Sequence, residues 1–557
     1  MLKNRYQITK LEWSIIGLSI LLLSIGFLPP TQNWISLIYG STLFRILSIV
    51  FLFVWVIVYR LSLFHEGEQR ISFDFQTTLT YLLPLIAFLS LILLPAQRLE
   101  DPPWGSGDSL YLAETIPIFS QAFGFLATSN ELLELFIRSK LYLLLHNRIG
   151  IINSLGLYSY LAGIVHIIAV HLYLMRHPKA WLLPGWLILF FTPTSVLYAG
   201  YIENYSMSRA LLMSITLLSL TTIETSNRGT RIILIRFITV LASLAVAHHL
   251  ISGLILSALV YLLYIVAKQE KSPKQFFIKE AFTAIVISVF ILTTIFGAFY
   301  FTEFRQIVFE DGHIQTHSLR SLGAILTSKT LISIIQILLL YPASLLVLPK
   351  LFSKQKSTTV QFLLIAVIPF ILFAIIWRPA IGFPADWDLF SYFLIPFSVL
   401  TFHQLSKISF LSFALLRASI LLSILTIVPG LAWQLWLHQE SALTSRNLKY
   451  IAHLNENTIP ILENSRFIKA SPLKQKKTLL SVYLIREKML YRINELHHES
   501  RLQENETIPL TKEINSLWFN YLDNKDNITN TNQGFLNMLN HFYTIYTTIN
   551  KEWNQLQ

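Results

Sequence analysis

The sequence of 557 residues contains no cysteine and few charged residues. The absence of cysteine excludes disulfides, thiolate metal sites and a cysteine nucleophile, although it leaves the cellular compartment open. Charged residues make up only 13% of the chain, whereas hydrophobic residues make up 54%. A soluble chain of this length needs far more polar surface, so the apolar excess must face lipid. The composition therefore predicts an integral membrane protein.

Signals for nucleic-acid binding are also missing, although the formal net charge is +12. Many of the lysines and arginines cluster in short connections between apolar runs, as orientation signals of membrane proteins do. The sequence shows no basic tract interleaved with stacking aromatics, and no zinc finger, P-loop or dinucleotide-binding fingerprint. We therefore expect no nucleic-acid partner.

Long apolar runs dominate the first three quarters of the chain. A helix needs about 20 mostly apolar residues to cross a bilayer. The first run follows Lys3, Arg5 and Lys10 without a cleavage pattern after it, so we interpret it as a retained span. We expect an all-α polytopic protein of about thirteen transmembrane helices, at residues 11–30, 43–63, 78–95, 150–175, 181–199, 205–223, 231–247, 250–267, 281–301, 322–348, 360–377, 389–402 and 410–431.

The distribution of charge predicts the orientation of these spans. With the N-terminus in the cytoplasm, every loop expected on that side carries lysine or arginine, as the positive-inside rule demands. The sorting is imperfect, because Arg138, Lys140 and Arg148 fall on the opposite side within a long insert. The same opposite side holds Asp101, Asp108, Glu203, His248, His249, Glu303, Glu310, Asp311, His313, His317, Asp386 and Asp388.

The insert at residues 96–148 is the longest non-spanning segment of the membrane part. Two amphipathic stretches in it, at 110–125 and 131–146, predict helices that lie flat in the interface. Asp108 directly precedes the first stretch, after Gly105 and Gly107. It is placed to cap a helix that begins near Leu110, or to present a carboxylate at the mouth of a cavity, and the two roles are compatible.

The character of the chain changes after residue 432. Residues 433–557 are rich in Lys, Glu, Asn and Gln, with apolar residues at helical spacing and no run that could span. We therefore expect two domains: a polytopic transmembrane domain at 1–432 and a soluble, mainly helical domain at 433–557. An odd number of spans places the second domain on the non-cytoplasmic side.

Four short outer segments carry a resemblance to a known family. They are the acid Asp108 at the start of the insert, the turn Gly200-Tyr201-Ile202-Glu203-Asn204-Tyr205, the pair His248-His249, and the late loop from Arg378 to Phe390. In this order, with interfacial helices after the first acid, the segments resemble the GT-C glycosyltransferases. These are membrane enzymes that take a sugar from a polyprenyl- or dolichyl-phosphate carrier. The chain departs from the family pattern because two further spans precede the acidic loop.

The resemblance implies a role for each acid and for three basic residues. Asp108 would be the base or would orient the acceptor, and Glu203 would be the second catalytic acid. Arg378, His248 and His249 would bind the donor phosphate. The donor would be a polyprenyl-phosphate sugar, the acceptor a glycan, lipid or protein, and the location a bacterial inner membrane with the active site on its outer side.

A metal site is a separate hypothesis at Asp386-Trp387-Asp388. In an extended loop, alternate residues share a face, so both carboxylates can bind one divalent ion. Two solvated acids beside an interfacial tryptophan fit the same pattern. The adjacent His248 and His249 should point to different helical faces, which disfavours a shared ligand, and Glu203 also fits an ordinary interfacial loop residue.

Other functions of polytopic proteins stay open. A transporter or a lipid-linked glycan flippase needs ionisable residues near the bilayer midplane, where the expected spans hold almost none besides His166, His171 and Arg236. An O-antigen polymerase or ligase would place a large basic outer loop late in the membrane part, but the loop near Arg378 is short and acidic. A non-catalytic scaffold would account for the tail but not for the gathering of acids in the outer turns.

Overall fold

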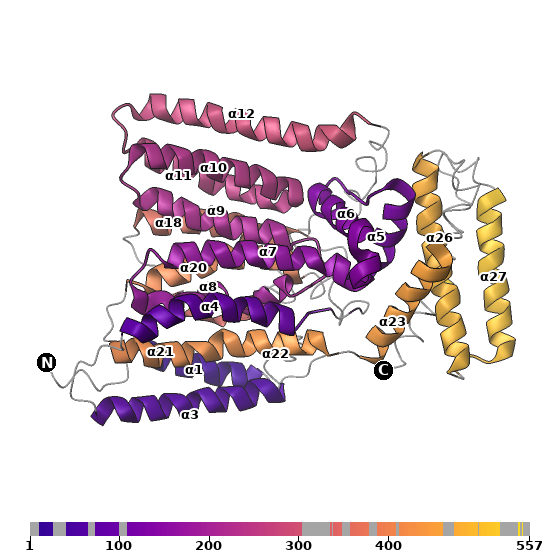
Figure 1. Cartoon of the computed structure of the whole chain (residues 1–557), viewed down its shortest axis with the longest axis horizontal. Coiled ribbons are helices and arrows are strands. Elements are labelled where there is room, and N and C mark those ends of the chain that lie inside the picture. The colour runs from indigo at the N-terminus through magenta and orange to yellow at the C-terminus, as the bar shows by residue number, and fades with distance from the viewer. Residues whose placement is uncertain are drawn as a thin grey trace.

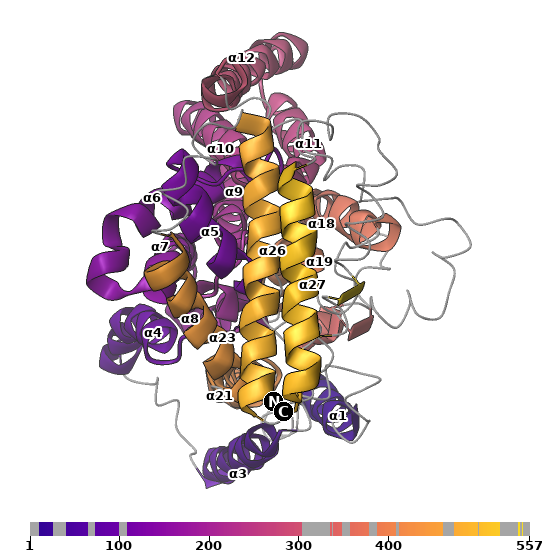
Figure 2. The same cartoon turned by 90° about the vertical axis from the view of Figure 1, so that its right-hand side faces the viewer.

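The computed structural model describes residues 10–25, 41–64, 73–97, 99, 109–302, 335–336, 338–347, 357–377, 387–407, 412–439, 441–459, 473–499, 501–523, 544–545 and 549. Within this part of the chain, every regular element is a helix. The long apolar helices run side by side as a bundle, and a second group of helices lies beyond one end of it (Figure 1). Figure 2 looks along the bundle from that end.

The bundle contains both straight spans and interrupted ones. Its α-helices are α1 (Lys10–Ile25), α3 (Thr42–Phe64), α4 (Phe73–Leu93), α7 (Ile151–Leu174), α8 (Leu182–Leu189), α9 (Ser206–Glu224), α10 (Arg228–His248), α11 (Leu256–Ala267), α12 (Pro273–Tyr300), α18 (Thr358–Ile376), α20 (Leu394–Leu405), α21 (Ser412–Leu425) and α22 (Ile427–His438). Short 3-10 helices at Lys179–Trp181, Pro193–Tyr198, Leu250–Ile255, Pro342–Val347 and Ser391–Phe393 extend or interrupt several spans.

The chain is a polytopic helical membrane protein, but the expected number of about thirteen spans is not confirmed. Among the described residues, eight helices are long and apolar enough to cross a membrane. The apolar run expected at 181–199 forms the short α8 and then a 3-10 helix that begins at Pro193. The run expected at 389–402 is similarly divided between a 3-10 helix and α20.

The two N-terminal spans lie at one edge of the bundle. Both α1 and α3 pack against α21, and α3 also contacts α22. The third span, α4, packs against α7 and leads into the insert. The first two spans are therefore peripheral to the helices around the insert.

A buried ion pair fastens the first span to α21. Arg417 Nε donates to Glu12 Oε1 at 2.8 Å, and both side chains are almost completely buried. The indole of Trp55 donates to the same carboxylate oxygen at 3.2 Å, and the Arg417 guanidinium lies 5.2 Å from the centroid of the Tyr59 ring. Helices α1, α3 and α21 are thereby joined through one acid.

Replacing Arg417 by methionine should strongly destabilise this edge. Removal of one partner leaves the Glu12 carboxylate buried and uncompensated, which costs about 3–5 kcal/mol. We expect Arg417→Met to lower the thermal unfolding temperature of the purified protein, followed by tryptophan fluorescence. The double variant with Glu12→Gln removes both charges and should recover most of the loss. A single variant as stable as the wild type would show that the pair does not stabilise the protein.

Beyond the bundle, two helices of the insert lie beside the C-terminal helices (Figure 1). The insert forms α5 (Ser109–Phe123) and α6 (Leu132–Ile149), which confirms the two helices expected there. After α22, which passes the expected domain boundary and ends at His438, come α23 (Ala442–His453), α26 (Leu473–His498) and α27 (Glu504–Asp523).

The C-terminal helices are bound to the insert by both polar and apolar contacts. Lys488 of α26 pairs with Glu114 of α5 at 2.6 Å, and both side chains are buried. The hydroxyl of Tyr142 on α6 donates to Asn455 Oδ1 at 2.7 Å. An apolar cluster joins the same elements through Leu112, Ile116, Leu135, Tyr450, Ile451 and Leu480. The position of α5 therefore depends on the C-terminal helices.

Candidate functional site

The outer turns expected to form a site meet at the end of the bundle next to α5 and α6. The start of the insert is tied to the Glu203 turn, because the Ala96 amide donates to Ala199 O at 2.7 Å. Gly200 has a φ of +75°, and a Cβ atom there would lie 2.6 Å from the Tyr160 hydroxyl. A residue with a side chain would therefore be strained and sterically blocked at this position.

Three of the expected site residues lie outside the described residues: Asp108, Arg378 and Asp386. Helix α5 starts at Ser109, the first described residue after Asp108. Leu110 in its first turn belongs to the same apolar cluster as Ile202, the residue before Glu203. The beginning of α5 and the Glu203 turn thus contribute to one apolar cluster.

The guanidinium of Arg138 is the centre of the polar network at this site. Its side chain is completely buried, projecting from α6. It donates to Leu155 O at 2.7 Å and to the backbone carbonyl of Glu203, and it pairs with Glu134 at 3.2 Å. The hydroxyls of Ser159 and Ser206 each lie 3.2 Å from Nη2. Arg138 therefore links α6, α7 and the beginning of α9.

Glu134 also holds His248 at the end of α10. The carboxylate Oε2 lies 3.3 Å from His248 Nδ1, and the Tyr158 hydroxyl lies 3.3 Å from the same ring nitrogen. The imidazole stacks on the Tyr158 ring with centroids 5.9 Å apart. His248 is thus fixed in a buried position between a carboxylate and a phenol.

His249 contacts a different carboxylate, that of Glu131. Its Nδ1 accepts from the Ile251 amide at 3.2 Å, which leaves the proton of a neutral ring on Nε2. Nε2 lies 3.5 Å from Glu131 Oε1, and the Asn204 amide donates to Glu131 Oε2 at 3.0 Å. The two adjacent histidines point to different partners, as expected from their spacing.

Glu203 itself lies at the centre of the turn between α8 and α9. Only 1% of its surface is exposed, and its carbonyl accepts from Arg138. The preceding Tyr201 connects this turn to the late outer segment, because its hydroxyl lies 3.5 Å from Asp388 Oδ2. The acids Glu203 and Asp388 are thereby brought into one network, although 185 positions separate them in the sequence.

Asp388 belongs to the short helix α19 (Trp387–Phe390). Its carboxylate Oδ1 accepts from the Leu389 amide at 2.9 Å, while its backbone carbonyl accepts from Arg209 Nη1 at 3.2 Å. Arg209 also donates to Ser391 Oγ at 2.9 Å. The first turn of α9 therefore holds the segment that follows Asp386.

The part of the chain that the structure describes contains no group of three or more His, Asp or Glu side chains that could hold a metal ion. His248 and His249 form separate pairs with Glu134 and Glu131 rather than one ligand shell. The hypothesis of a divalent ion at Asp386 and Asp388 continues to rest on the sequence pattern.

Sequence reasoning overlooked Glu131, Glu134, Arg138 and Arg209. The first three lie three and four residues apart, a spacing that places them on one face of α6. Arg138 was also one of the cations that broke the expected charge distribution. The position of Arg138, a cation on the side of the acidic loops, could therefore have been used to predict a buried ion pair.

Comparisons with known proteins gave structural similarity alone. No protein-family model matches the chain, and no curated protein matches it. A crystal structure of ArnT from Cupriavidus metallidurans in the apo state has a TM-score of 0.42 at 13% identity, covering 86% of this chain and 75% of that chain. A structure of ArnT from the same organism bound to undecaprenyl phosphate has a TM-score of 0.38 at 13% identity, covering 86% and 76%.

Proposed function

We propose that the chain is a glycosyltransferase that moves a sugar from a polyprenyl-phosphate-linked donor to an acceptor on the non-cytoplasmic face of a bacterial inner membrane. The observation that carries the proposal is the gathering of Glu203, His248, His249 and Asp388 in turns that hydrogen bonds and ion pairs hold in place. Leu110, in the first turn of α5 after Asp108, shares an apolar cluster with Ile202 of the Glu203 turn.

The reaction needs a base for the acceptor. An acceptor hydroxyl loses its proton as it attacks the anomeric carbon, and a carboxylate within hydrogen-bond reach can accept that proton. In our proposal Asp108 is this base. Glu203 is the second acid, and its backbone is fixed by Arg138.

The departing lipid phosphate needs positive charge. Negative charge develops on it in the transition state, and a fixed cation or a metal ion stabilises that charge. We assign this role to Arg378, with Asp386 and Asp388 as proposed ligands of a divalent ion. We also assign donor binding to His248 and His249, each of which lies beside a glutamate.

Ionisable residues within the spans do not favour the transport alternative. The structure reveals two spanning acids that the sequence analysis did not count, Glu12 in α1 and Glu280 in α12. Glu12 pairs with Arg417, and Glu280 pairs with Arg236 at 3.1 Å. Both acids are thus engaged between neighbouring helices, and we attribute to them a role in helix packing.

The test is sugar transfer in membranes that carry the wild type or Glu203→Gln. With a panel of radiolabelled polyprenyl-phosphate sugars, we expect transfer by the wild type and a loss of about 100-fold or more in the variant, in the range of a removed catalytic acid. Glu224→Gln is the matched control, because Glu224 ends the same helix that Glu203 precedes, at the opposite end of the span. It should transfer normally.

Two outcomes would contradict the proposal. Absence of transfer from every donor in the panel, with the protein folded and in the membrane, would remove the glycosyltransferase assignment. Equal transfer by the wild type and Glu203→Gln would keep the reaction but remove Glu203 from it.

A further inference from the structure

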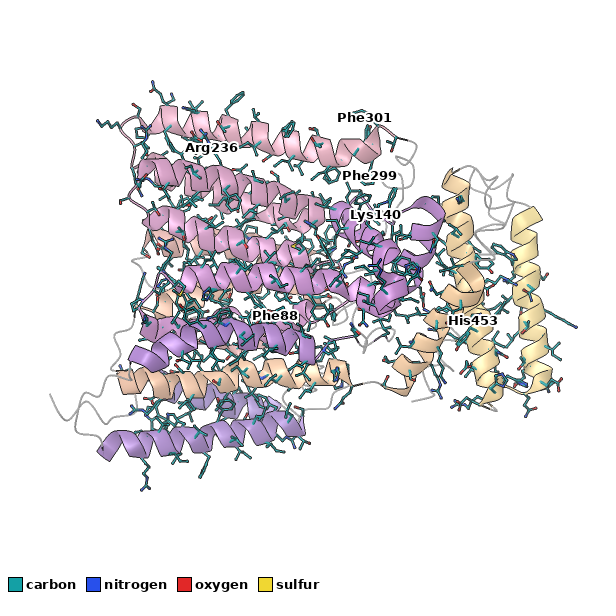
Figure 3. All side chains as sticks on the ribbon, viewed as in Figure 1. Phe88, Lys140, Arg236, Phe299, Phe301 and His453 are labelled. Atoms are coloured by element: carbon teal, nitrogen blue, oxygen red, sulfur yellow. The ribbon has the colours of Figure 1, made fainter. Side chains whose placement is uncertain are left out.

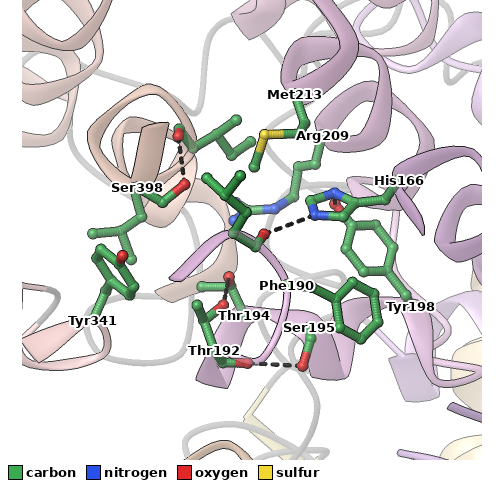
Figure 4. Close-up of a pocket in the computed structure, with 13 residues that line it drawn as sticks. His166, Phe190, Thr192, Thr194, Ser195, Tyr198, Arg209, Met213, Tyr341 and Ser398 are labelled. Atoms are coloured by element: carbon green, nitrogen blue, oxygen red, sulfur yellow. Dashed lines mark hydrogen bonds between the residues drawn. The ribbon is translucent and has the colours of Figure 1, made fainter. Parts of the chain in front are cut away.

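A small polar cavity lies below the outer site, between α7, α9 and α20. Figure 4 shows Tyr341 and Ser398 on one side of it and His166 and Tyr198 on the other, with the Arg209 side chain between them. The remaining lining consists of apolar side chains and of the hydroxyls of Thr192, Thr194 and Ser195. The cavity is separate from the Glu131, Glu134 and Arg138 network described above.

Arg209 is a buried cation that forms no salt bridge with any carboxylate in the part of the chain that the structure describes. Only 1% of its surface is exposed. Its Nη1 donates to the carbonyl of Asp388 and to Ser391 Oγ, which are neutral acceptors. Among the described residues, no carboxylate oxygen lies within 4.0 Å of the guanidinium. Burying such a charge without a counter-ion is costly, most of all inside a membrane bundle.

The rest of the lining supplies no negative charge. His166 Nε2 lies 3.0 Å from Leu189 O, so this nitrogen carries a proton. Its Nδ1 then accepts from the Tyr198 hydroxyl at 2.9 Å, which makes the ring neutral. Arg209 also lies in the first turn of α9, at the positive end of that helix dipole. Arg209 is therefore the one charged side chain in the lining, with the Asp388 carboxylate as the opposing charge beside it.

Two buried donors border the cavity. Arg209 Nε and the Tyr341 hydroxyl have no partner within hydrogen-bond geometry, although Tyr198 lies close to Arg209 and Thr401 lies close to Tyr341. The nearby Thr401 hydroxyl donates to Phe397 O at 2.9 Å. The hydroxyls of Thr192 and Thr194 form one hydrogen bond with each other at 2.8 Å. This bond uses the proton of one hydroxyl, so the other hydroxyl can still donate its proton. Three donors, one of them on the Arg209 cation, thus border a space in which the side-chain acceptors are hydroxyl oxygens.

The size of the cavity limits what can bind. Its volume is about 20 Å³, which is room for one water molecule or a monatomic ion of similar size. Phosphate, a sugar or a carboxylic acid does not fit this volume. We infer that the cavity is a binding site for a single halide ion, with chloride held by Arg209, Tyr341 and a threonine hydroxyl. Through Arg209, this ion stabilises the turn that carries Asp388 and Ser391.

The experiment measures halide binding by the purified full-length protein. We expect the unfolding temperature to rise saturably in sodium chloride and sodium bromide, but not in sodium gluconate at equal ionic strength. Equilibrium dialysis with radioactive chloride should give one ion per chain. This readout needs no sugar transfer, so its failure is distinguishable from failure of the proposed function.

Two tyrosine variants give a matched comparison. Tyr341→Phe removes one donor and should weaken chloride binding about tenfold, in line with one hydrogen bond to a charged group. Tyr173→Phe removes another buried hydroxyl that forms no hydrogen bond but lies outside the cavity, and should bind chloride normally. Arg209→Gln should abolish the response to chloride.

The inference would be overturned by equal unfolding temperatures in chloride and gluconate, which would mean that the cavity takes water only. Unchanged chloride binding in Tyr341→Phe would place the ion elsewhere. A larger stabilisation by inorganic phosphate than by chloride would contradict the size argument and indicate an oxyanion.

Discussion

Asp108→Asn should abolish sugar transfer while leaving the protein folded. Removal of a general base typically lowers the rate by about 100- to 10,000-fold. Asparagine is about as good as aspartate at the N-cap of a helix, so α5, which begins at Ser109, should keep its first turn. The measurement is the initial rate of transfer from a polyprenyl-phosphate sugar, together with the thermal unfolding temperature of each variant.

This substitution separates the two roles that the sequence allows for Asp108. If the residue only capped α5, Asp108→Asn and Asp108→Ser would both retain activity, whereas Asp108→Ala would lose stability and activity together. Asp101→Asn, in the same insert, is the control for a general effect of lost negative charge. Full activity in Asp108→Asn would assign Asp108 to helix capping and leave the base to another acid of the site.

A span could be predicted from the sequence where its run of apolar side chains is enough to define its ends. For example, the turn between α10 and α11 was expected between residues 247 and 250, and His249 lies in it. Prolines show where this reasoning fails. Pro84 and Pro369 lie within the continuous helices α4 and α18, whereas Pro193 begins a 3-10 helix. Neighbouring helices can satisfy the backbone groups that proline frees, so its effect depends on tertiary contacts that one segment does not encode.

The candidate site was predictable as a set of loops but not as a set of contacts. Topology placed Glu203, His248, His249 and Asp388 on one side, and the structure brings them to one end of the bundle. The partners of these residues come from α6 and α9, which face inward. A charged residue on an amphipathic helix resembles a solvated one until the packing of that helix is known.

Arg138 illustrates this, because in the sequence it is an exception to the charge distribution and in the structure it is completely buried. Its guanidinium meets the carbonyls of Leu155 and Glu203 and the carboxylate of Glu134. One side chain thus joins α6, α7 and the Glu203 turn. The geometry of the Glu203 turn should therefore depend on Arg138 more than on any apolar contact of α6.

We accordingly expect Arg138→Met to cost about 3–5 kcal/mol of stability, the usual penalty for breaking a buried ion pair. The double variant Glu134→Gln/Arg138→Met removes both charges, so it should regain much of the stability. It should not regain sugar transfer, because the Glu203 carbonyl still lacks the hydrogen bond from Arg138 that fixes this turn. Arg148→Met, an exposed cation at the end of the same helix, is the matched control and should resemble the wild type in both assays.

The comparison of the two readouts decides what Arg138 does. Recovery of stability without activity in the double variant would make Arg138 a positioning residue for Glu203, acting through the backbone it holds. Recovery of both stability and sugar transfer would mean that Arg138 serves only as a partner in a structural ion pair. The Glu203 turn would then keep its active geometry without the guanidinium. Wild-type stability in Arg138→Met would contradict the buried network itself, since a carboxylate as enclosed as that of Glu134 cannot lose its cation without a penalty.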